Sequence, residues 1–498
     1  MRKTALLIAL VSVVCCLTLT PTSPFVFAQA QGSRVALSAA EQQMVSGFEK
    51  RVRDYADMRE RLEARLPKLS KEAKPEEIER HKAAFQELVR SARPGAKQGD
   101  VFTPEAAAFI RAVIRDEYKG RERAELREEV LVEAENKAVP ARVNYPYPET
   151  QELLEMSPTL LLRLPQLPKQ VRYRFVRNNL FIVDRENGLI VDFMTDVLPP
   201  SSVKVKPAPS APEGENVAAR VAPPAGPNAV LPVVLPNRDD SVRLMLVGDT
   251  GTGSKQQNEL AQLMIRYQQA FPFEFALMVG DNMYGSEKAA DYKKKFEDVY
   301  KPLLDQNVKF YAALGNHDES NQRFYDHFNM KGEEYYQFQK GDVSFYALNS
   351  NYMDKKQLQW FEDKLKADTS NWKVAFFHHP PYSSGGKHGS EVGLREVVEP
   401  LFVRYGVNVV LAGHEHFYER IKPQKGVYYF ISGAAGKLRK GDVKKGSPLT
   451  AKAYDADMSF MLIEFTKDAM HFQVISRTGE TVDSGSLPNQ RRAAGDSK

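Results

Sequence analysis

Cysteine is almost absent from this chain, which holds two in 498 residues, Cys15 and Cys16. Both lie in the first thirty residues, so we expect the rest of the chain to contain no disulfide and no thiolate metal site. Charge of one sign is not in large excess either, because 69 basic and 64 acidic side chains leave a formal net charge of +5. With no dense basic block, this balance gives no reason to expect nucleic-acid binding.

The first thirty residues are typical of a secretory signal. Two basic residues precede an apolar run over 5–19, and Ala28-Gln29-Ala30 offers small side chains for cleavage. The run is shorter than the roughly 20 residues of a membrane-spanning helix. We therefore predict a cleaved signal peptide over 1–30, a secreted or periplasmic protein, and no stable membrane insertion after cleavage. A lipid anchor is not expected, because the bulky Val14 before Cys15 fits a lipobox poorly.

Two patterns follow the signal. Charged, helix-favouring residues dominate 37–137, and Thr103-Pro104-Glu105 has the capping hydroxyl, early proline and early acid of a helix start. Val171, Tyr173 and Phe175 then alternate with Arg172 and Arg174, and apolar runs follow over 180–183 and 189–193, which indicates a three-stranded meander. We predict a smaller, mainly helical α+β domain over 34–198. Nothing in it has catalytic spacing, and binding of an unidentified envelope partner is an open hypothesis for its role.

The second half of the chain follows a stretch rich in proline and alanine. Residues 199–240 predict a semi-rigid linker. Downstream, apolar strands alternate with helical patterns, and each strand runs into a loop rich in Gly, Asp, Asn or His. Since α/β sheets build their sites at strand ends, the sequence predicts a site-bearing α/β domain over 241–487 and a disordered tail over 488–498. The expected strands include 244–247, 275–279, 310–314, 374–377 and 407–411.

Five short segments hold the residues of interest. They are Gly248-Asp249-Thr250-Gly251, Gly280-Asp281-Asn282-Met283-Tyr284, Gly315-Asn316-His317-Asp318, His378-His379-Pro380 and Gly413-His414-Glu415-His416. Seven of the nine histidines fall between His317 and His416. Carboxylate, amide and imidazole donors at successive loops suit hard or borderline transition metals, and a dinuclear site is the simplest interpretation.

In this order, the five segments resemble the calcineurin-like metallophosphoesterase superfamily, and within it the purple acid phosphatases, over about residues 243–488. The resemblance implies a four-layer α/β/β/α metallophosphoesterase sandwich. Most superfamily members carry Asp-x-His in the first segment, whereas Gly251 replaces that His here and Tyr284 follows Asp281 by three positions. A phenolate is a hard, anionic donor suited to Fe(III), so the exchange favours the purple acid phosphatase type. The fibronectin-like domain of the large plant members is absent, and the helical domain stands in its place.

The resemblance also implies the cofactors: two metal ions, Fe(III) and a divalent ion that is Fe, Zn or Mn. The ferric ion would be held by Asp249, Asp281, Tyr284 and His416, and the divalent ion by Asp281, Asn316, His378 and His414. Asp281 would bridge the two ions, and His379 fits a supporting role better than a ligand. A metal-bound hydroxide would attack the ester. His317 and His388 would be catalytic and, with Asn316, would bind the substrate, His388 because the loop 383–389 resembles the family's substrate-facing loop.

The leading hypothesis is therefore hydrolysis of small phosphate monoesters, an acid phosphatase activity. The ligand set does not separate monoesters from diesters, so a phosphodiesterase acting on nucleotides or phospholipid head groups stays open. An inactive envelope-binding protein is a third alternative, against which the presence of all seven ligands argues. A phosphate-binding P-loop is excluded, because Ser254 separates Gly253 from Lys255 and Gln256 replaces the required hydroxyl residue.

Overall fold

The computed structural model describes residues 37–118, 140–147, 156–176, 178–198 and 231–489. All of them fall in one unit, Leu37–Lys498. The predicted signal over 1–30, most of the predicted linker and nearly all of the predicted tail lie outside the described residues. Within the described residues, no helix combines the length and the apolar character needed to cross a membrane.

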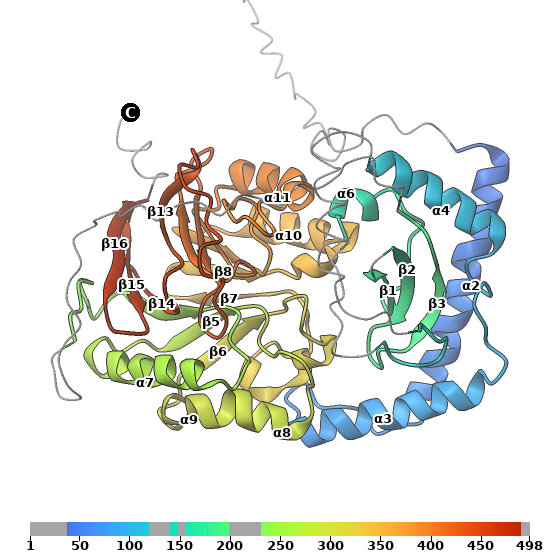
Figure 1. Cartoon of the computed structure of the whole chain (residues 1–498), viewed down its shortest axis with the longest axis horizontal. Helices are drawn as coiled ribbons and strands as arrows, with labels where there is room; N and C mark the ends of the chain where they lie inside the picture. Colours follow the sequence, from blue (N-terminus) through green and yellow to red (C-terminus); the bar gives the residue numbers. More distant parts are fainter. Residues whose placement is uncertain (1–36, 119–139, 148–155, 177, 199–230, 490–498) are drawn as a thin grey trace, which may run out of the picture. The chain divides into compact units, whose positions relative to one another are not determined.

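Helices open the described chain (Figure 1). They are α2 (Ala39–Glu63), α3 (Pro75–Ala92), α4 (Pro104–Glu117) and the short α6 (Pro158–Leu161). The predicted helix start at Thr103 is confirmed, because its Oγ1 accepts a hydrogen bond from the backbone N–H of Ala106 (3.4 Å) and Pro104 takes the first helical position. Part of the predicted helical region, residues 119–139, lies outside the described residues.

The predicted three-stranded meander is confirmed. Strands β1 (Val171–Val176), β2 (Asn179–Asp184) and β3 (Ile190–Met194) pair antiparallel in that order. With α2, α3 and α4 they enclose a core that includes Phe48, Phe85, Ile110, Phe175 and Leu180. Arg172 and Arg174 alternate with the apolar side chains of β1 and are nevertheless buried, so this strand needs polar partners outside its own core.

Two larger sheets make up the second half of the chain. The first has the order β16-β15-β14-β4-β5-β6, and the second has the order β13-β11-β12-β10-β9-β8-β7. The first sheet contains β4 (Val242–Val247), β5 (Phe275–Val279), β6 (Lys309–Ala313), β14 (Ser459–Phe465), β15 (Ala469–Ser476) and β16 (Thr481–Pro488). The second contains β7 (Tyr336–Lys340), β8 (Val343–Ala347), β9 (Trp372–Phe376), β10 (Val409–Ala412), β11 (Tyr418–Ile421), β12 (Tyr428–Ser432) and β13 (Thr450–Tyr454).

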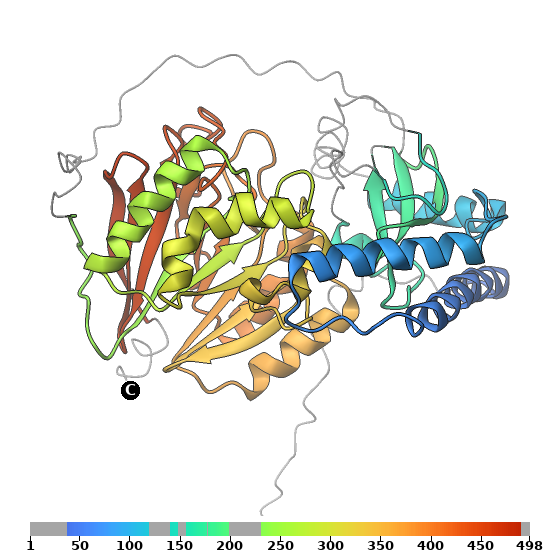
Figure 2. The same cartoon turned by 90° about the horizontal axis from the view of Figure 1, so that it is seen from below.

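The two sheets pack face to face with helices outside them (Figures 1 and 2). Along β4, Leu244 and Leu246 join a core shared by both sheets, whereas Met245 and Val247 join the core beneath the outer helices. The helices over the first sheet are α7 (Lys255–Ala270), α8 (Ala289–Tyr292), a π-helical turn (Lys293–Glu297) and α9 (Asp298–Asp305). Those over the second sheet are α10 (Lys355–Ala367) and α11 (Val392–Tyr405). The predicted α/β/β/α sandwich is therefore confirmed.

Three short 3₁₀ turns lie between these elements, at Ser320–Phe324, Asp326–Phe328 and Ser350–Tyr352. The first two follow the Gly315–Asp318 segment, and the third follows β8.

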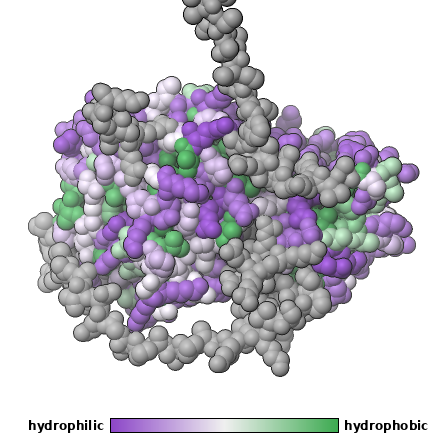
Figure 3. Space-filling view, turned by 90° about the horizontal axis from the view of Figure 1, so that it is seen from above, coloured by the Kyte–Doolittle hydropathy of each residue, from purple (hydrophilic) through white to green (hydrophobic). Residues whose placement is uncertain are grey.

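Figure 3 shows a mostly hydrophilic face with separate apolar patches. Exposed large apolar side chains include Leu37, Tyr145, Val234 and Val403, which lie far apart in the sequence. Such scattered residues are ordinary on a protein surface.

Candidate metal centre

The five segments meet at one edge of the sandwich. Three of them directly follow β4, β5 and β10, and the other two follow β6 and β9 after one residue, so strands from both sheets deliver them. Parallel neighbours end on the same side, which brings their loops together. Asp249, Asp281 and His414 hold positive φ angles of 56°, 50° and 69°. A left-handed backbone at non-glycine residues costs roughly 1–3 kcal/mol and is concentrated at functional sites.

Asp249, Tyr284 and His416 form the first group of donors. The Tyr284 hydroxyl donates a hydrogen bond to Oδ1 of Asp249 (3.0 Å) and lies 3.3 Å from Nε2 of His416. That nitrogen is 3.4 Å from Oδ1 of Asp249. Ligand atoms of Asp249, Asp281 and His416 all lie within 4.8 Å of one another. The four residues predicted to hold the ferric ion are therefore neighbours.

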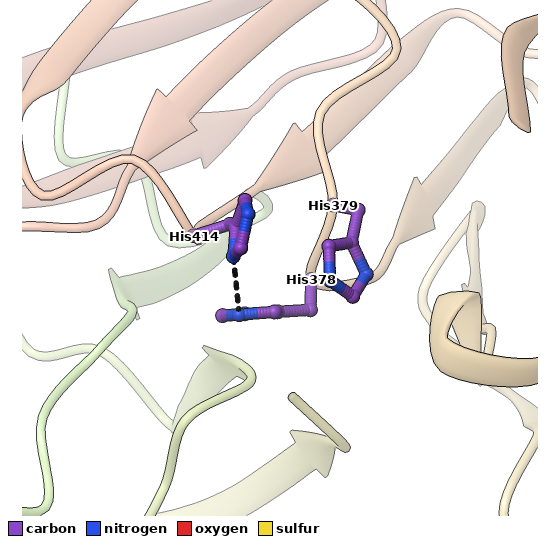
Figure 4. Close-up of side chains that lie close together, drawn as sticks. All are labelled: His378, His379 and His414. Carbon is purple, nitrogen blue, oxygen red and sulfur yellow. Dashed lines mark hydrogen bonds between the residues drawn. The ribbon is translucent and has the colours of Figure 1, made fainter. Parts of the chain in front are cut away.

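His378 is the centre of the second group, and Figure 4 shows its contact with His414. Its Nδ1 lies 2.9 Å from the carbonyl oxygen of Val279. Its Nε2 faces Oδ1 of Asn316 (2.9 Å), Nδ1 of His414 (3.2 Å) and Oδ1 of Asp281 (3.4 Å). Because Nδ1 donates its proton to the Val279 carbonyl, Nε2 is the ring nitrogen left for a ligand, and oxygen and nitrogen donors of three other residues surround it. A cation at this point makes such a convergence favourable, so these residues fit a metal ion.

Asp281 lies between the two groups. Its side chain belongs to the cluster with Asp249 and His416 and also approaches His378, while its Oδ1 accepts a hydrogen bond from the backbone N–H of His317 (3.0 Å). It is 1% exposed, so its charge has little water to stabilise it. The position is the one that a bridging carboxylate requires. The assignment of the seven ligands stays a prediction, but the structure brings all seven together.

Burial and neighbouring charges set the protonation of the donors. Burial raises the pKa of Tyr284 well above its usual 10, and the charges of Asp249 and Asp281 raise it further. Burial, and then the neighbouring histidines, hold the pKa of His414 well below 6.5, so its ring is neutral. Burial alone would raise the pKa of Asp249, but the hydrogen bond with His416 and the charges of His378 and His416 lower it. The site therefore holds a neutral imidazole and a carboxylate, as a metal requires, together with a protonated phenol.

Gly251 explains why a tyrosine, and not a histidine, serves this site. A Cβ atom at Gly251 would lie 2.0 Å from the carbonyl oxygen of Asn282, so no side chain fits there without moving the second segment. The Gly251 carbonyl instead accepts a hydrogen bond from the backbone N–H of Tyr284 (3.0 Å). This contact places the Tyr284 ring so that its hydroxyl reaches Asp249. The sequence has Gly251 in place of the histidine of most superfamily members and Tyr284 as the additional donor, and the close backbone packing at Gly251 accompanies this replacement.

The other predicted histidines surround the two groups. His379 lies with its Nδ1 2.9 Å from Oγ of Ser350 and its ring 4.5 Å from that of His414, so it belongs to the same histidine cluster as His378 (Figure 4). The ring of His388 is 4.2 Å from that of His414. The ring of His317 is 4.8 Å from that of Tyr284. His317 and His388 thus flank the site on either side, and their roles stay predictions.

Asp318 and Glu415 are functional residues that the sequence analysis did not single out. The Asp318 carboxylate accepts hydrogen bonds from the backbone N–H groups of Gly315 (2.8 Å), Asn282 (3.1 Å) and Met283 (3.0 Å), which joins the second and third segments. Burial and then the charge of Asp281 raise its pKa to about 7.

Glu415 Oε1 accepts hydrogen bonds from the Ser383 hydroxyl (2.9 Å) and the backbone N–H of Gly389 (2.8 Å), which holds the loop of His388. Asp318 and Glu415 both lie inside the five segments, and an acid directly next to a candidate site residue was the available signal. A third residue, Lys437, places its ammonium 3.6 Å from the centre of the Tyr284 ring. No motif marks Lys437 in the sequence.

Comparisons with known proteins agree with this geometry. Residues 242–418 match the model of the calcineurin-like phosphoesterase family, and all five segments lie inside that range. The chain is 27% identical over 269 residues to purple acid phosphatase 17 of Arabidopsis thaliana, a match that covers 46% of this chain and 79% of the relative.

The chain is also 25% identical over 304 residues to tartrate-resistant acid phosphatase type 5 of Oryctolagus cuniculus, a match that covers 51% of this chain and 93% of the relative. Among solved structures, purple acid phosphatase PPD1 of yellow lupin (Lupinus luteus) has a TM-score of 0.43 and 15% identity, covering 71% of this chain and 68% of that one.

We predict that metal binding displaces the Tyr284 proton. Because the raised pKa of Tyr284 keeps the phenol protonated at neutral pH, a metal ion that binds it must release that proton, and the metal affinity must fall as the pH is lowered. In Tyr284→Phe, Zn²⁺ binding at pH 7 should release about one proton fewer per chain. Calorimetric titration in buffers of different ionisation enthalpy measures this number. Tyr311→Phe, at a ring stacked on Phe338, is the control, and equal proton release from wild type and Tyr284→Phe would contradict the prediction.

Proposed function

We propose that this chain is a phosphoric ester hydrolase that hydrolyses small phosphate monoesters with two metal ions, in keeping with the match of residues 242–418 to the calcineurin-like phosphoesterase family. One observation carries the proposal: seven oxygen and imidazole donors from five separate segments converge at one edge of the sandwich. When bound, two such ions lower the pKa of water and neutralise charge on the phosphoryl oxygens. Asp249, Asp281, Tyr284 and His416 would hold one ion, and Asp281, Asn316, His378 and His414 the other.

The residues around the donors supply binding and proton transfer. The backbone of His317 is anchored to Asp281, and its side chain is 23% exposed, so the ring can reach a bound phosphate. His388 is held next to His414 by a loop that Glu415 fixes. An imidazole at either position can donate a proton to the leaving alkoxide, and His388 is our first choice for that role. Asn316 and His317 would orient the phosphate.

We propose iron for the site that Tyr284 serves, with Fe, Zn or Mn at the other. The phenolic oxygen and two carboxylates make a hard, anionic donor set, which Fe(III) prefers. The secretory pattern of residues 1–30 supports action outside the cytoplasm, in the periplasm or the medium. An envelope partner for residues 37–198 remains part of the proposal and would be compatible with that location.

The metal assignment predicts colour. Purified protein lacking residues 1–30 should contain about two metal ions per chain and show a broad visible band from phenolate-to-iron charge transfer. Tyr284→Phe should lose this band. Metal analysis and an absorption spectrum measure both properties. A colourless protein loaded with manganese or zinc would reject iron and favour the alternative of a neutral-pH phosphodiesterase.

The substrate assignment predicts a preference between two esters. An aryl monophosphate should be hydrolysed faster than the corresponding bis(aryl) phosphate, because the dianionic monoester gains more from two adjacent cations. Steady-state rates on both esters, measured from pH 4 to pH 8, provide the comparison. A faster reaction of the diester would replace the monoesterase with the phosphodiesterase, and failure to hydrolyse either ester would favour the inactive, envelope-binding alternative.

The bridging role predicts the effect of Asp281→Asn. Removing the bridging negative charge should lower kcat by at least about 100-fold and reduce the metal content, since changes even to outer-shell partners cost about 10–100-fold. Asp305→Asn, on the surface of α9 and paired with Lys301, is the matched control and should retain full activity. Full activity in Asp281→Asn would reject the proposed site.

A further inference from the structure

The chain that follows the third segment is bound by residues of the first half of the protein. We call residues 319–334 the contact segment and residues 37–198 the N-terminal segment. Lys82 pairs with Glu319 (2.5 Å), and the amide of Asn321 donates a hydrogen bond to the Glu186 carbonyl oxygen (2.5 Å). Arg323 pairs with the Glu186 carboxylate (2.5 Å). Contacts with the N-terminal segment thus recur along the whole 3₁₀ turn Ser320–Phe324.

Backbone pairing extends these contacts. The N–H of Ala73 donates a hydrogen bond to the Phe324 carbonyl (2.7 Å), and the N–H of Asp326 donates one to the Ala73 carbonyl (3.2 Å). Ala73 and Tyr325 form an isolated parallel bridge, and Lys74 pairs with Asp326 beside it. Side chains and backbone therefore hold this stretch together, which leaves it little freedom to shift.

Buried charges make the contact costly to break. Arg172 on β1 pairs with Glu334 (2.6 Å), and their side chains are 5% and 7% exposed. Arg185 lies 3.3 Å from the same carboxylate. Burial alone would raise the pKa of Glu334, but the charges of Arg172, Arg185 and Arg323 hold it well below its usual range. Glu334 and Arg323 thus depend on the N-terminal segment for the opposite charges that balance them in this buried position, and removing one partner from such a pair is strongly destabilising.

The contact segment continues directly into the candidate metal centre. Gln322 donates a hydrogen bond to Asp318 (2.7 Å) and accepts one from Asn282 (3.1 Å). On the other side, the Asn351 amide donates hydrogen bonds to the carbonyls of Leu314 (3.1 Å) and Gly315 (3.0 Å). The N-terminal segment reaches this side too, because Arg174 donates a hydrogen bond to the Asn351 carbonyl (3.4 Å). The loop of Asn316 and His317 is therefore supported from both flanks.

We propose that the N-terminal segment positions the Gly315–Asp318 loop, with Arg172, Glu186 and Arg323 as positioning residues for Asn316 and His317. The inference rests on the proposed function only in treating Asn316 as a metal ligand. The segment thereby gains a role inside this chain that needs no outside partner. Residues that hold ligands in place commonly affect metal affinity without touching the ion.

A double-mutant cycle across the Glu186–Arg323 pair tests the proposal. Glu186→Gln, Arg323→Gln and the double variant are compared with wild type in two measurements: amide hydrogen exchange of residues 314–326 in the metal-free protein, and affinity for Zn²⁺. Each single variant should speed the exchange and weaken the binding of one of the two ions roughly 10–100-fold. The double variant should be no worse than either single variant, and Arg323→Lys, which keeps the charge, should restore part of the affinity.

The matched control is Arg163→Gln, which removes pairs with Asp116 (2.5 Å) and Glu117 (2.8 Å) inside the N-terminal segment. It should lower thermal stability but leave exchange at 314–326 and Zn²⁺ affinity unchanged. Lys82→Gln, at a pair whose side chains are 19% and 26% exposed, repeats the test if the buried variants fold poorly. The proposal would be overturned if the Glu186 and Arg323 variants showed the same hydrogen exchange and Zn²⁺ affinity as Arg163→Gln. It would also be overturned if the effects of the two single variants were strictly additive in the double variant.

The result is independent of ester hydrolysis. A wild type that hydrolyses no phosphate ester, yet loses Zn²⁺ affinity in Glu186→Gln, would reject the proposed function and support the positioning role. If the wild type hydrolyses phosphate esters but the variants keep wild-type hydrogen exchange and metal affinity, the proposed function would be supported and the positioning role rejected. In an active enzyme, Glu186→Gln should lower kcat more than it raises KM, because a shifted His317 weakens interactions made in the transition state.

Discussion

The buried carboxylate pair of Asp249 and Asp281 is the constraint on which the rest of the catalytic half depends. Neither residue is more than 1% exposed, and both take left-handed backbone conformations where their strands end. Charges placed there need partners, and the neighbouring backbone N–H groups, histidines and Tyr284 supply them. A bound cation would satisfy the same charges more fully, so metal binding and local folding should be coupled. The close approach of the Asn282 backbone to Gly251 and of the His378 side chain to Gly280 reflects the same crowding.

Local patterns in the sequence predicted the parts of this arrangement that depend on neighbours along the chain. The strand that ends before Asp249, the capped helix that begins after Thr103 and the three-stranded meander are each set by periodicity and turn chemistry over a few residues. The proximity of the seven candidate ligands was predictable for a different reason: strand-end placement in α/β sheets brings separate loops together once the strands are known. The resemblance of the five segments to a known superfamily then supplied the division into two metal sites.

The remaining features depend on contacts between residues far apart in the sequence. Nothing local distinguishes Lys437, which lies over the Tyr284 ring, from the other lysines of its loop. The same holds for Glu334. Its burial depends on its contact with Arg172 of β1, which is 162 residues away in the sequence. Arg172 and Arg174 were read as the polar positions of an alternating strand, although both are buried. A period-two pattern gives the face on which a side chain lies, but not whether water or another segment covers that face.

The order of charges along the contact segment gives the attachment a register. Lys82 meets Glu319, Glu186 meets Arg323, Lys74 meets Asp326 and Arg172 meets Glu334, so the N-terminal partners carry both signs along the chain. Shifting one surface past the other would bring like charges together in a buried setting, which is far more costly than losing a surface pair. An apolar contact of equal area would tolerate such a shift. Paired charges of both signs, with the Arg172–Glu334 pair buried, therefore suit an attachment that fixes the position of one loop, because a shift of register would separate the pairs.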